Sequence, residues 1–171
     1  QLGAIGSDDL QKLNTSQIGA LSADQLSGLT TLQVQQLTSS QMAGLTATQL
    51  GKLSSAQINA LDDIDLKQLS TAQVGAFGAA ALSGATTAKI AAIETNQVAG
   101  LTVSQIKAMT TAQVKALSST QFDELNATQL AALGSAQISA IDTEDLSNLS
   151  SSQLGAINPT QIAGLTTTQL N

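Results

Sequence analysis

The sequence lacks the residues on which most catalytic and metal-binding chemistry depends. Its 171 residues include no histidine and no cysteine. Zinc sites, thiol nucleophiles, redox pairs and imidazole proton shuttles are therefore excluded. The serine and threonine hydroxyls have no histidine to activate them, and nearly all the lysines fall where turns are expected. We therefore predict that the protein is not an enzyme, with no catalytic residues, no cofactor-binding residues and no cofactor.

Arginine and aromatic side chains are also scarce. All six basic residues are lysines, Phe77 and Phe122 are the only aromatic residues, and twelve acidic residues bring the net charge to -6. Such a chain has few groups that neutralise phosphates and no set of rings on which bases stack, so nucleic acid is not an expected partner. No apolar run reaches the roughly 17 to 25 residues of a membrane helix, and we expect no membrane insertion.

What the sequence does have is a period of eight residues, without insertion or deletion from end to end. We number the repeat so that position one is Ile5, Leu13 and every eighth residue thereafter. The consensus is Leu-[Ser/Thr]-x-x-Gln-[Ile/Leu/Val]-x-[Ala/Gly]. Positions one and six are apolar in every repeat, and position five is glutamine in 17 of 22 repeats. The five departures from glutamine are Asp9, Asp65, Ala81, Lys89 and Asp145.

The period predicts one short helix per repeat. A continuous helix would carry positions one and six around its whole circumference, because eight residues advance it by about 80° beyond two turns. A strand would point positions one and six to opposite faces, and the repeat is rich in Ala, Gln and Leu rather than β-branched and aromatic residues. A β-solenoid therefore stays a second alternative to a helical one.

Helix-start signals recur in register with the period. Position two is almost always Ser, Thr, Asn, Asp or Gly, which are the preferred N-cap residues. Glutamine three residues later completes a capping box. Pro159, the only proline, falls at the first helical position, where its missing N–H costs nothing. Most acids occupy positions two to five and most lysines positions seven and eight, as the helix dipole favours.

These signals predict an all-α protein: an α-solenoid of very short capped helices, one helix per eight-residue repeat, forming an elongated rod. Residues 1–171 are expected to be a single repeat array of about 21 repeats, cut from a longer one. We expect positions one and six inside, and Ser/Thr, Gln and position-seven residues such as Gly19, Asn59 and Ser139 outside or at helix ends. Small residues at position eight are expected to let the chain leave each helix tightly.

The number of helices per turn is less directly encoded. At position eight, small residues alternate with Gln36, Lys52 and Gln68 over part of the chain. This alternation favours two helices per turn and a rod of about 100 Å, against about 70 Å for three helices per turn. Residues 77–85 lose the glutamine and shrink a core leucine to Ala85. We interpret them as local drift filled by Phe77, with a bend or a lateral contact as the alternative.

Two acidic clusters are the only candidates for a metal site. Calcium takes several oxygen ligands, but neither cluster has the spacing of an EF-hand, and both occupy helix starts that the dipole already favours. We therefore predict that no metal is bound. The clusters are Asp62, Asp63 and Asp65, and Asp142, Glu144 and Asp145.

The octad in residues 69–76, Leu-Ser-Thr-Ala-Gln-Val-Gly-Ala, resembles the octapeptide-repeat arrays of large repetitive secreted bacterial surface proteins, adhesin-like and RTX-type. The resemblance covers the whole chain. It implies an extracellular, bacterial cell-surface setting and a structural role as a stiff spacer, stalk or filament-forming rod. Its partners would be other copies in fibres or flanking repeats of the same array. The alternative is a repetitive binding module whose outer Thr, Ser and Gln face engages glycan, ice or another copy.

Overall fold

The structure is a computed structural model and describes residues 5–170. Within that range every regular element is a helix of four to six residues, and none of the described residues lies in a strand. The all-α prediction with one helix per eight-residue repeat is therefore confirmed. The helices are α1 (Ser7–Gln11), α2 (Thr15–Gly19), α3 (Ala23–Ser27), α4 (Thr31–Gln35), α5 (Ser39–Ala43), α6 (Ala47–Leu50), α7 (Ser55–Ala60), α8 (Asp63–Gln68), α9 (Thr71–Ala76), α10 (Ala79–Ser83), α11 (Thr87–Ala91), α12 (Thr95–Val98), α13 (Val103–Ala108), α14 (Thr111–Lys115), α15 (Ser119–Asp123), α16 (Ala127–Ala132), α17 (Ser135–Ile138), α18 (Thr143–Ser147), α19 (Ser151–Leu154) and α20 (Pro159–Ile162).

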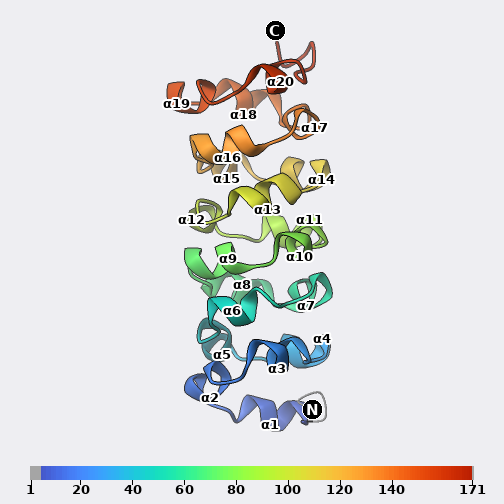
Figure 1. Ribbon diagram of the computed structural model, residues 1–171, viewed down its shortest axis with the longest axis vertical. Coiled ribbons are helices and arrows are strands. Elements are labelled where there is room, and N and C mark those ends of the chain that lie inside the picture. Colours follow the sequence, from blue (N-terminus) through green and yellow to red (C-terminus); the bar gives the residue numbers. More distant parts are fainter. Residues whose placement is uncertain (1–4, 171) are drawn as a thin grey trace.

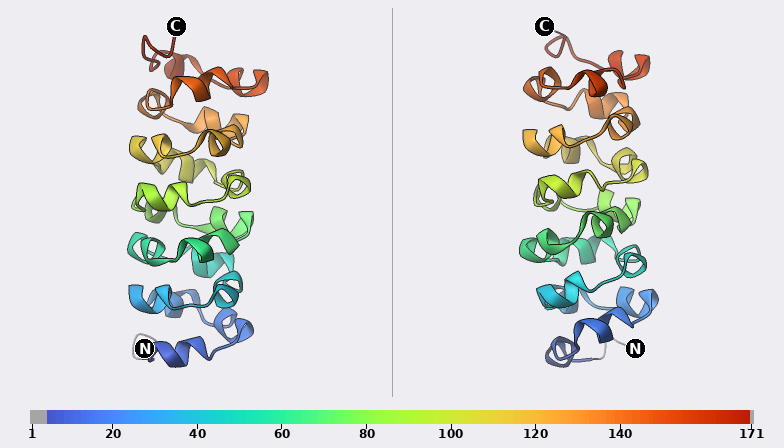
Figure 2. Two further views of the ribbon diagram at one scale, coloured as in Figure 1. Left: turned by 180° about the vertical axis from the view of Figure 1, so that it is seen from behind. Right: turned by 90° about the vertical axis from the view of Figure 1, so that its left-hand side faces the viewer.

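Helices three places apart in the chain pack on one another along the array: α1 on α4, α4 on α7, α2 on α5, α3 on α6, and so on to α17 on α20. The chain therefore climbs one turn every three repeats, or 24 residues, and the helices form three parallel stacks (Figures 1 and 2). The expectation of two helices per turn was wrong. The alternation at position eight is confined to part of the chain and reflects local packing, whereas the turn is set by the contacts described below.

Capping boxes start the helices as predicted. Thirteen helices have both halves of the box, with the N-cap side chain accepting from the backbone N–H of the glutamine and the glutamine side chain accepting from the N-cap N–H. In α14, for example, Thr110 and Gln113 exchange these bonds at 2.9 and 3.1 Å. Pro159 takes the first position of α20, where no backbone donor is needed. Because helices this short are unstable in isolation, they depend on packing against neighbours.

Positions one and six form one continuous core along the axis. Every position-six residue from Leu10 to Ile138, and every position-one residue from Leu29 to Ile141, is buried. The core passes without a gap through the irregular residues 77–85, where Phe77 is buried beside the small Ala85. The assignment of the inside positions is therefore confirmed, and the bulky Phe77 lies in the core as the local-drift interpretation expects.

Small residues at the helix ends serve close stacking. No described glycine has a positive φ, and the glycines that follow helices, such as Gly44, are right-handed. The expected use of glycine to leave each helix was therefore wrong. At Gly100, a Cβ atom would lie 2.4 Å from the carbonyl oxygen of Thr71, one turn below. Glycine is required there because two backbones of one stack nearly touch.

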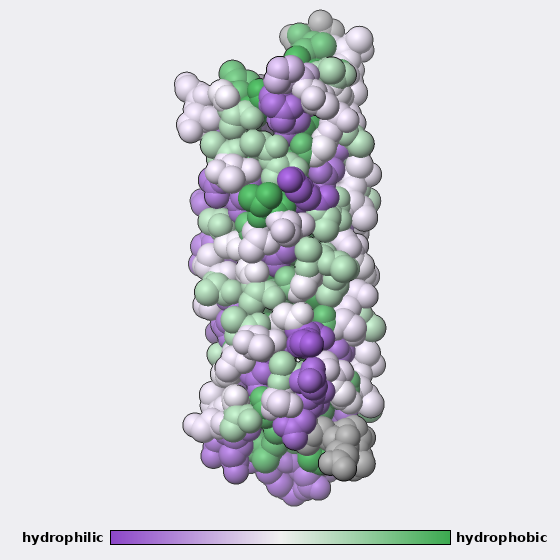
Figure 3. Space-filling view, viewed as in Figure 1, coloured by the Kyte–Doolittle hydropathy of each residue, from purple (hydrophilic) through white to green (hydrophobic). Residues whose placement is uncertain are grey.

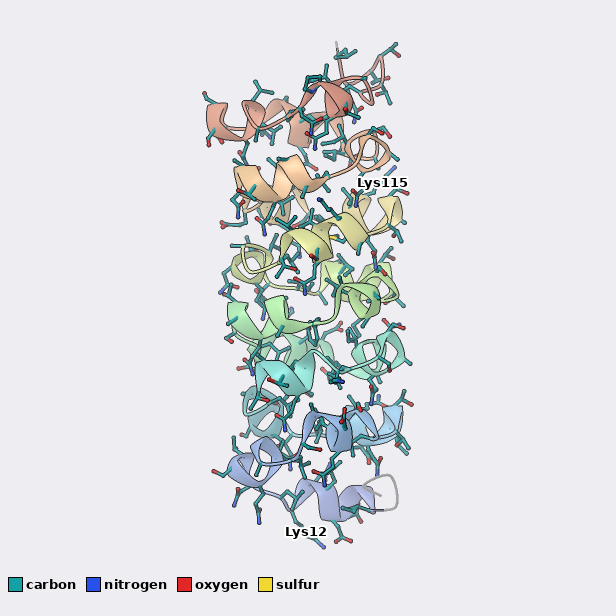
Figure 4. All side chains as sticks on the ribbon, viewed as in Figure 1. Lys12 and Lys115 are labelled. Carbon is teal, nitrogen blue, oxygen red and sulfur yellow. The ribbon has the colours of Figure 1, made fainter. Side chains whose placement is uncertain are left out.

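The sides of the rod carry mostly small, weakly polar residues. Figure 3 shows pale surface over most of one face, with scattered strongly polar side chains. Lys12 and Lys115 project outwards from the rod, as expected for lysines that follow helix ends (Figure 4). In the described residues, the helices are far too short for any of them to cross a membrane.

Candidate functional site

The most organised polar feature of the molecule is the column of glutamines at position five. Eleven of these glutamines, beginning with Gln33, are buried, and Gln49, Gln105, Gln113 and Gln161 are only 1% exposed. The expectation that glutamine lies outside or at helix ends was therefore wrong for most of the array. A buried amide needs partners for both its oxygen and its nitrogen.

Each glutamine uses its two amide atoms in different directions. In Gln113, Oε1 accepts from the N-cap N–H of Thr110 at 2.9 Å, within the same repeat. Its Nε2 donates to the carbonyl oxygens of Leu82 at 3.0 Å and Ala85 at 2.8 Å, in the turn below. One side chain thus closes the start of its own helix and bonds the backbone of the preceding turn.

The same connection recurs along the array, always to carbonyl oxygens 28 residues back and, in most repeats, also 31 or 30 residues back. We call this set of side chains the glutamine ladder. The carbonyl 28 residues back belongs to position one of the repeat directly below, which is how the ladder fixes the 24-residue turn. Its members are Gln33, Gln41, Gln49, Gln57, Gln73, Gln97, Gln105, Gln113, Gln121, Gln129, Gln137, Gln153, Gln161 and Gln169.

The ladder explains why position five is glutamine rather than another capping residue. Glutamate caps a helix as well as glutamine does, yet position five never holds glutamate. A carboxylate has no donor for the carbonyl oxygens below. The absence of glutamate was therefore the sequence signal for the ladder. The predicted alternative in which an outer glutamine face recognises a ligand was wrong for the buried glutamines, because both amide atoms are already bonded inside the rod.

The ladder is interrupted at Asp65 and Ala81. Asp65 is buried, and its Oδ1 accepts a hydrogen bond of 2.6 Å from the hydroxyl of Ser39, in the helix below. Ala81 has no polar side chain and packs against the core. Neither residue donates to the turn below, so the turn formed by residues 61–84 rests on residues 37–60 with Gln73 as its single ladder bond.

At Lys89 the two tasks of the missing glutamine are divided between two residues. The Lys89 ammonium group donates to the carbonyl oxygen of Leu61, 28 residues back, and pairs with Asp63 at 2.5 Å. The N–H of Thr86, which Gln would accept from, donates instead to Oδ1 of Asn59 at 2.8 Å. Asn59 also donates to the carbonyl oxygen of Gly84 at 3.3 Å. The expectation that Asn59 faces outwards and tolerates exchange was therefore wrong.

The two acidic clusters do not converge on a common point. Asp62 caps α8 and accepts from the N–H of Ile64 at 2.8 Å, Asp63 pairs with Lys89, and Asp65 binds Ser39. In the second cluster, Asp142 is the N-cap of α18 while Glu144 and Asp145 lie in its first turn. Across residues 5–170 no group of three acidic side chains is placed to hold a metal ion.

The remaining charges form ion pairs on the surface. Lys12 pairs with Asp9 at 2.9 Å, and its hydrogen bond and positive charge lower the pKa of the Asp9 carboxyl below its ordinary value. Lys52 pairs with Asp24 and Lys67 with Glu94, both at 3.5 Å. A shallow hollow of about 360 Å³ lies beside Asn59 and Lys89, but its polar groups already bond one another. These features stabilise neighbouring turns and present no nucleophile next to a base.

The fold and the ladder together define a class: a helical tandem-repeat solenoid with three eight-residue repeats per turn, cross-linked by buried glutamine amides. The chain belongs to the ALTTAQ repeat family, whose model matches residues 2–39, 90–126 and 138–171, more than half of the chain. Comparison with curated proteins gives no match. The repeat family indicates a repetitive structural protein. In the segment 108–113, Ala-Met-Thr-Thr-Ala-Gln, the final glutamine is the ladder residue Gln113.

Proposed function

We propose that the protein is a stiff spacer, a rod that acts by its length and regularity rather than by chemistry at one site. The observation that carries this proposal is the repetition of the same turn-on-turn interface from one end of the described chain to the other. Such arrays are quasi-one-dimensional, since each turn contacts its neighbours alone. Length then grows in proportion to the number of repeats.

Stiffness follows from how each turn is held. A bend that opens one side of the rod must separate stacked helices, expose core residues such as Leu101 and break the ladder bonds on that side. A buried carbonyl that loses its donor costs about 1 to 3 kcal/mol. A ladder bond from each of the three stacks, as with Gln113, Gln121 and Gln129, therefore resists bending in every direction.

The proposal includes a non-catalytic role and an extracellular setting on a bacterial surface. The setting is supported by the resemblance of the octad to the arrays of large secreted surface proteins. The non-catalytic role is supported by a sequence with no His and no Cys, and by polar side chains whose hydrogen-bonding capacity is used between repeats.

Small-angle X-ray scattering on a length series tests the spacer proposal. We expect the 171-residue chain to scatter as a rod about 70 Å long, since stacked helices lie about 8 to 10 Å apart. Duplicating one whole turn, residues 93–116, should lengthen the rod by about 8 to 10 Å with an unchanged cross-section. Duplicating only residues 93–108 is the control, because two repeats do not restore the stack register. A compact profile, with a radius of gyration near 15 to 16 Å, would contradict the proposal.

A further inference from the structure

The last turn of the described array exposes side chains that every earlier turn covers. Leu154 in α19 and Ile162 in α20 are 58% and 46% exposed. Their equivalents one turn earlier, Leu130 in α16 and Ile138 in α17, are both 0% exposed, because α19 and α20 pack on them. The chemistry of the four positions is the same, so the difference is the absence of a turn stacked above.

This end face has the shape and polarity of the interior interface. It holds a hollow of about 190 Å³ lined mainly by Leu146, Leu154, Ile157 and Leu165, and apolar surface gathers at the upper end of the rod in Figure 3. One turn earlier, the position-one carbonyl of Leu133 accepts Nε2 of Gln161 at 2.8 Å. The corresponding carbonyls of Ile157 and Leu165 receive no ladder bond within the described residues.

The first turn of the array offers the complementary groups. The Oε1 atoms of Gln17 and Gln25 accept from the N–H groups of Asn14 and Ser22, as in the interior repeats. Unlike Gln41, whose Nε2 donates to Leu10 and Leu13, both have Nε2 atoms without a partner among the described residues, and both are exposed. This end therefore presents donors, whereas the other end presents acceptors.

We infer that the 171-residue chain associates head-to-tail with a second copy, the turn containing α1 and α2 of one copy stacking on the turn containing α19 and α20 of the other. The occupant is a second copy because the interior of the rod already shows the same two faces joined, six times or more, by the same residues. A flanking turn in a longer array would make the identical interface within one chain. The inference rests on the proposed rod, since it requires two faces at opposite ends.

The arrangement also fixes the polarity of assembly. Two acceptor faces placed together would leave their carbonyl oxygens without donors, and two donor faces would leave their amides without acceptors. A head-to-tail contact is heterologous and does not close on itself when the copies share one axis. We therefore expect a linear chain of copies whose mean length rises with concentration.

Sedimentation velocity on chains blocked at one end tests the inference. The donor end is blocked by Gln17→Glu with Gln25→Glu, which keeps a capping oxygen and removes the amide donors. The acceptor end is blocked by Leu154→Glu with Ile162→Glu, at sites exposed enough to leave folding intact. The matched controls lie on the sides of the rod: Gln35→Glu with Gln68→Glu, and Leu32→Glu with Ile64→Glu, whose leucine and isoleucine are 56% and 66% exposed.

We expect the unmodified chain and both controls to form a concentration-dependent series of oligomers. Each blocked variant alone should stay monomeric to at least tenfold higher concentration, and an equimolar mixture of the two should stop at one heterodimer, because one intact end of each kind remains. The inference is overturned if the unmodified chain stays monomeric, if the acceptor-end variant assembles as before, or if the donor-end variant still dimerises. A monomer that scatters as a rod would refute this association and leave the spacer proposal standing.

Discussion

Residues 97–137 and residues 61–89 are built on the same repeat but hold their turns together differently. The first interval has a ladder glutamine in six successive repeats, from Gln97 to Gln137. The second has a regular ladder bond only at Gln73. The apolar core is equally continuous in both intervals. The comparison shows that the core makes the rod, while the ladder sets the register and uniformity of its turns.

The irregular interval retains inter-turn contacts through individual substitutes. Ser39 binds Asp65, Asn59 and Lys89 share the work of one glutamine, and small residues bring backbones together. A Cβ on Gly75 would lie 2.5 Å from the carbonyl oxygen of Gly100, which shows how close the stacked turns are beside this interval. The family model leaves residues 40–89 unmatched, and this segment contains three of the five departures from glutamine. Divergence in sequence and departure from the ladder therefore coincide.

The largest effect is expected where a ladder glutamine is removed from the regular interval. Gln113→Met keeps the volume but leaves the N–H of Thr110 and the carbonyls of Leu82 and Ala85 without their partner. We expect the free energy of unfolding to fall by about 3 kcal/mol, measured by urea denaturation. Gln17→Met is the control, because Gln17 makes only the capping bond, and its loss should cost about 1 kcal/mol. Equal losses would mean that the inter-turn half of the ladder contributes nothing.

A smaller loss is expected from the substitute pair in the irregular interval. Asn59→Ala removes the acceptor of the Thr86 N–H and the donor to Gly84, so we expect a loss of about 2 kcal/mol. In a Lys89→Gln background the restored glutamine would accept from Thr86 itself, and Asn59→Ala should then cost about 0.5 kcal/mol or less. A double-mutant cycle measures the coupling. Additive effects would show that Asn59 does not replace the missing glutamine.

Restoring the ladder should stabilise the irregular interval. Ala81→Gln would place an acceptor at the N–H of Gly78 and a donor at the carbonyls of Leu53 and Leu50, the positions 28 and 31 residues back that regular ladder glutamines use, as Gln113 does. We expect a gain of about 1 kcal/mol in the free energy of unfolding. Ala80→Gln, at the exposed neighbouring site, should change it by less than about 0.5 kcal/mol. If Ala81→Gln destabilised the protein, the interval would be too tightly packed to accept the ladder.

The smallest effect concerns Asp9, the departure from glutamine nearest the first turn. Lys12 lowers the pKa of its carboxyl in the folded protein, so this pair adds stability above the unfolded-state pKa of Asp and loses it as pH falls through the folded pKa. Because both groups are exposed, the change in unfolding free energy should be close to the detection limit. NMR titration is the better measurement: Lys12→Gln should return the Asp9 pKa towards its ordinary value. An unchanged pKa would remove the ion pair from the account.

The sequence predicted the parts of the fold that depend on local signals. N-cap residues, the glutamine three residues later and Pro159 lie within one repeat, and the structure places them as expected. The alternation of apolar positions likewise predicted the core. These features follow from the geometry of a single short helix, so an eight-residue window contains the information needed.

The number of helices per turn depends on contacts 28 residues apart, which the period alone does not contain. Every repeat looks the same, so two and three repeats per turn have equal local patterns. The exclusion of glutamate from position five was the one clue to a donor role, and it names no partner. Asn59 was misplaced for the same reason, because its partners Thr86 and Gly84 belong to the next turn.

The most direct test of the glutamine ladder is NMR of the side-chain amide protons. The account predicts that the Nε2 protons of Gln105 and Gln113 exchange slowly with solvent and show nuclear Overhauser contacts to residues 28 and 31 positions earlier, around Val74 and Phe77 for Gln105 and around Leu82 and Ala85 for Gln113. Rapid exchange, or contacts to residues eight positions nearer in sequence as two repeats per turn would require, would contradict the ladder and the three-helix turn together.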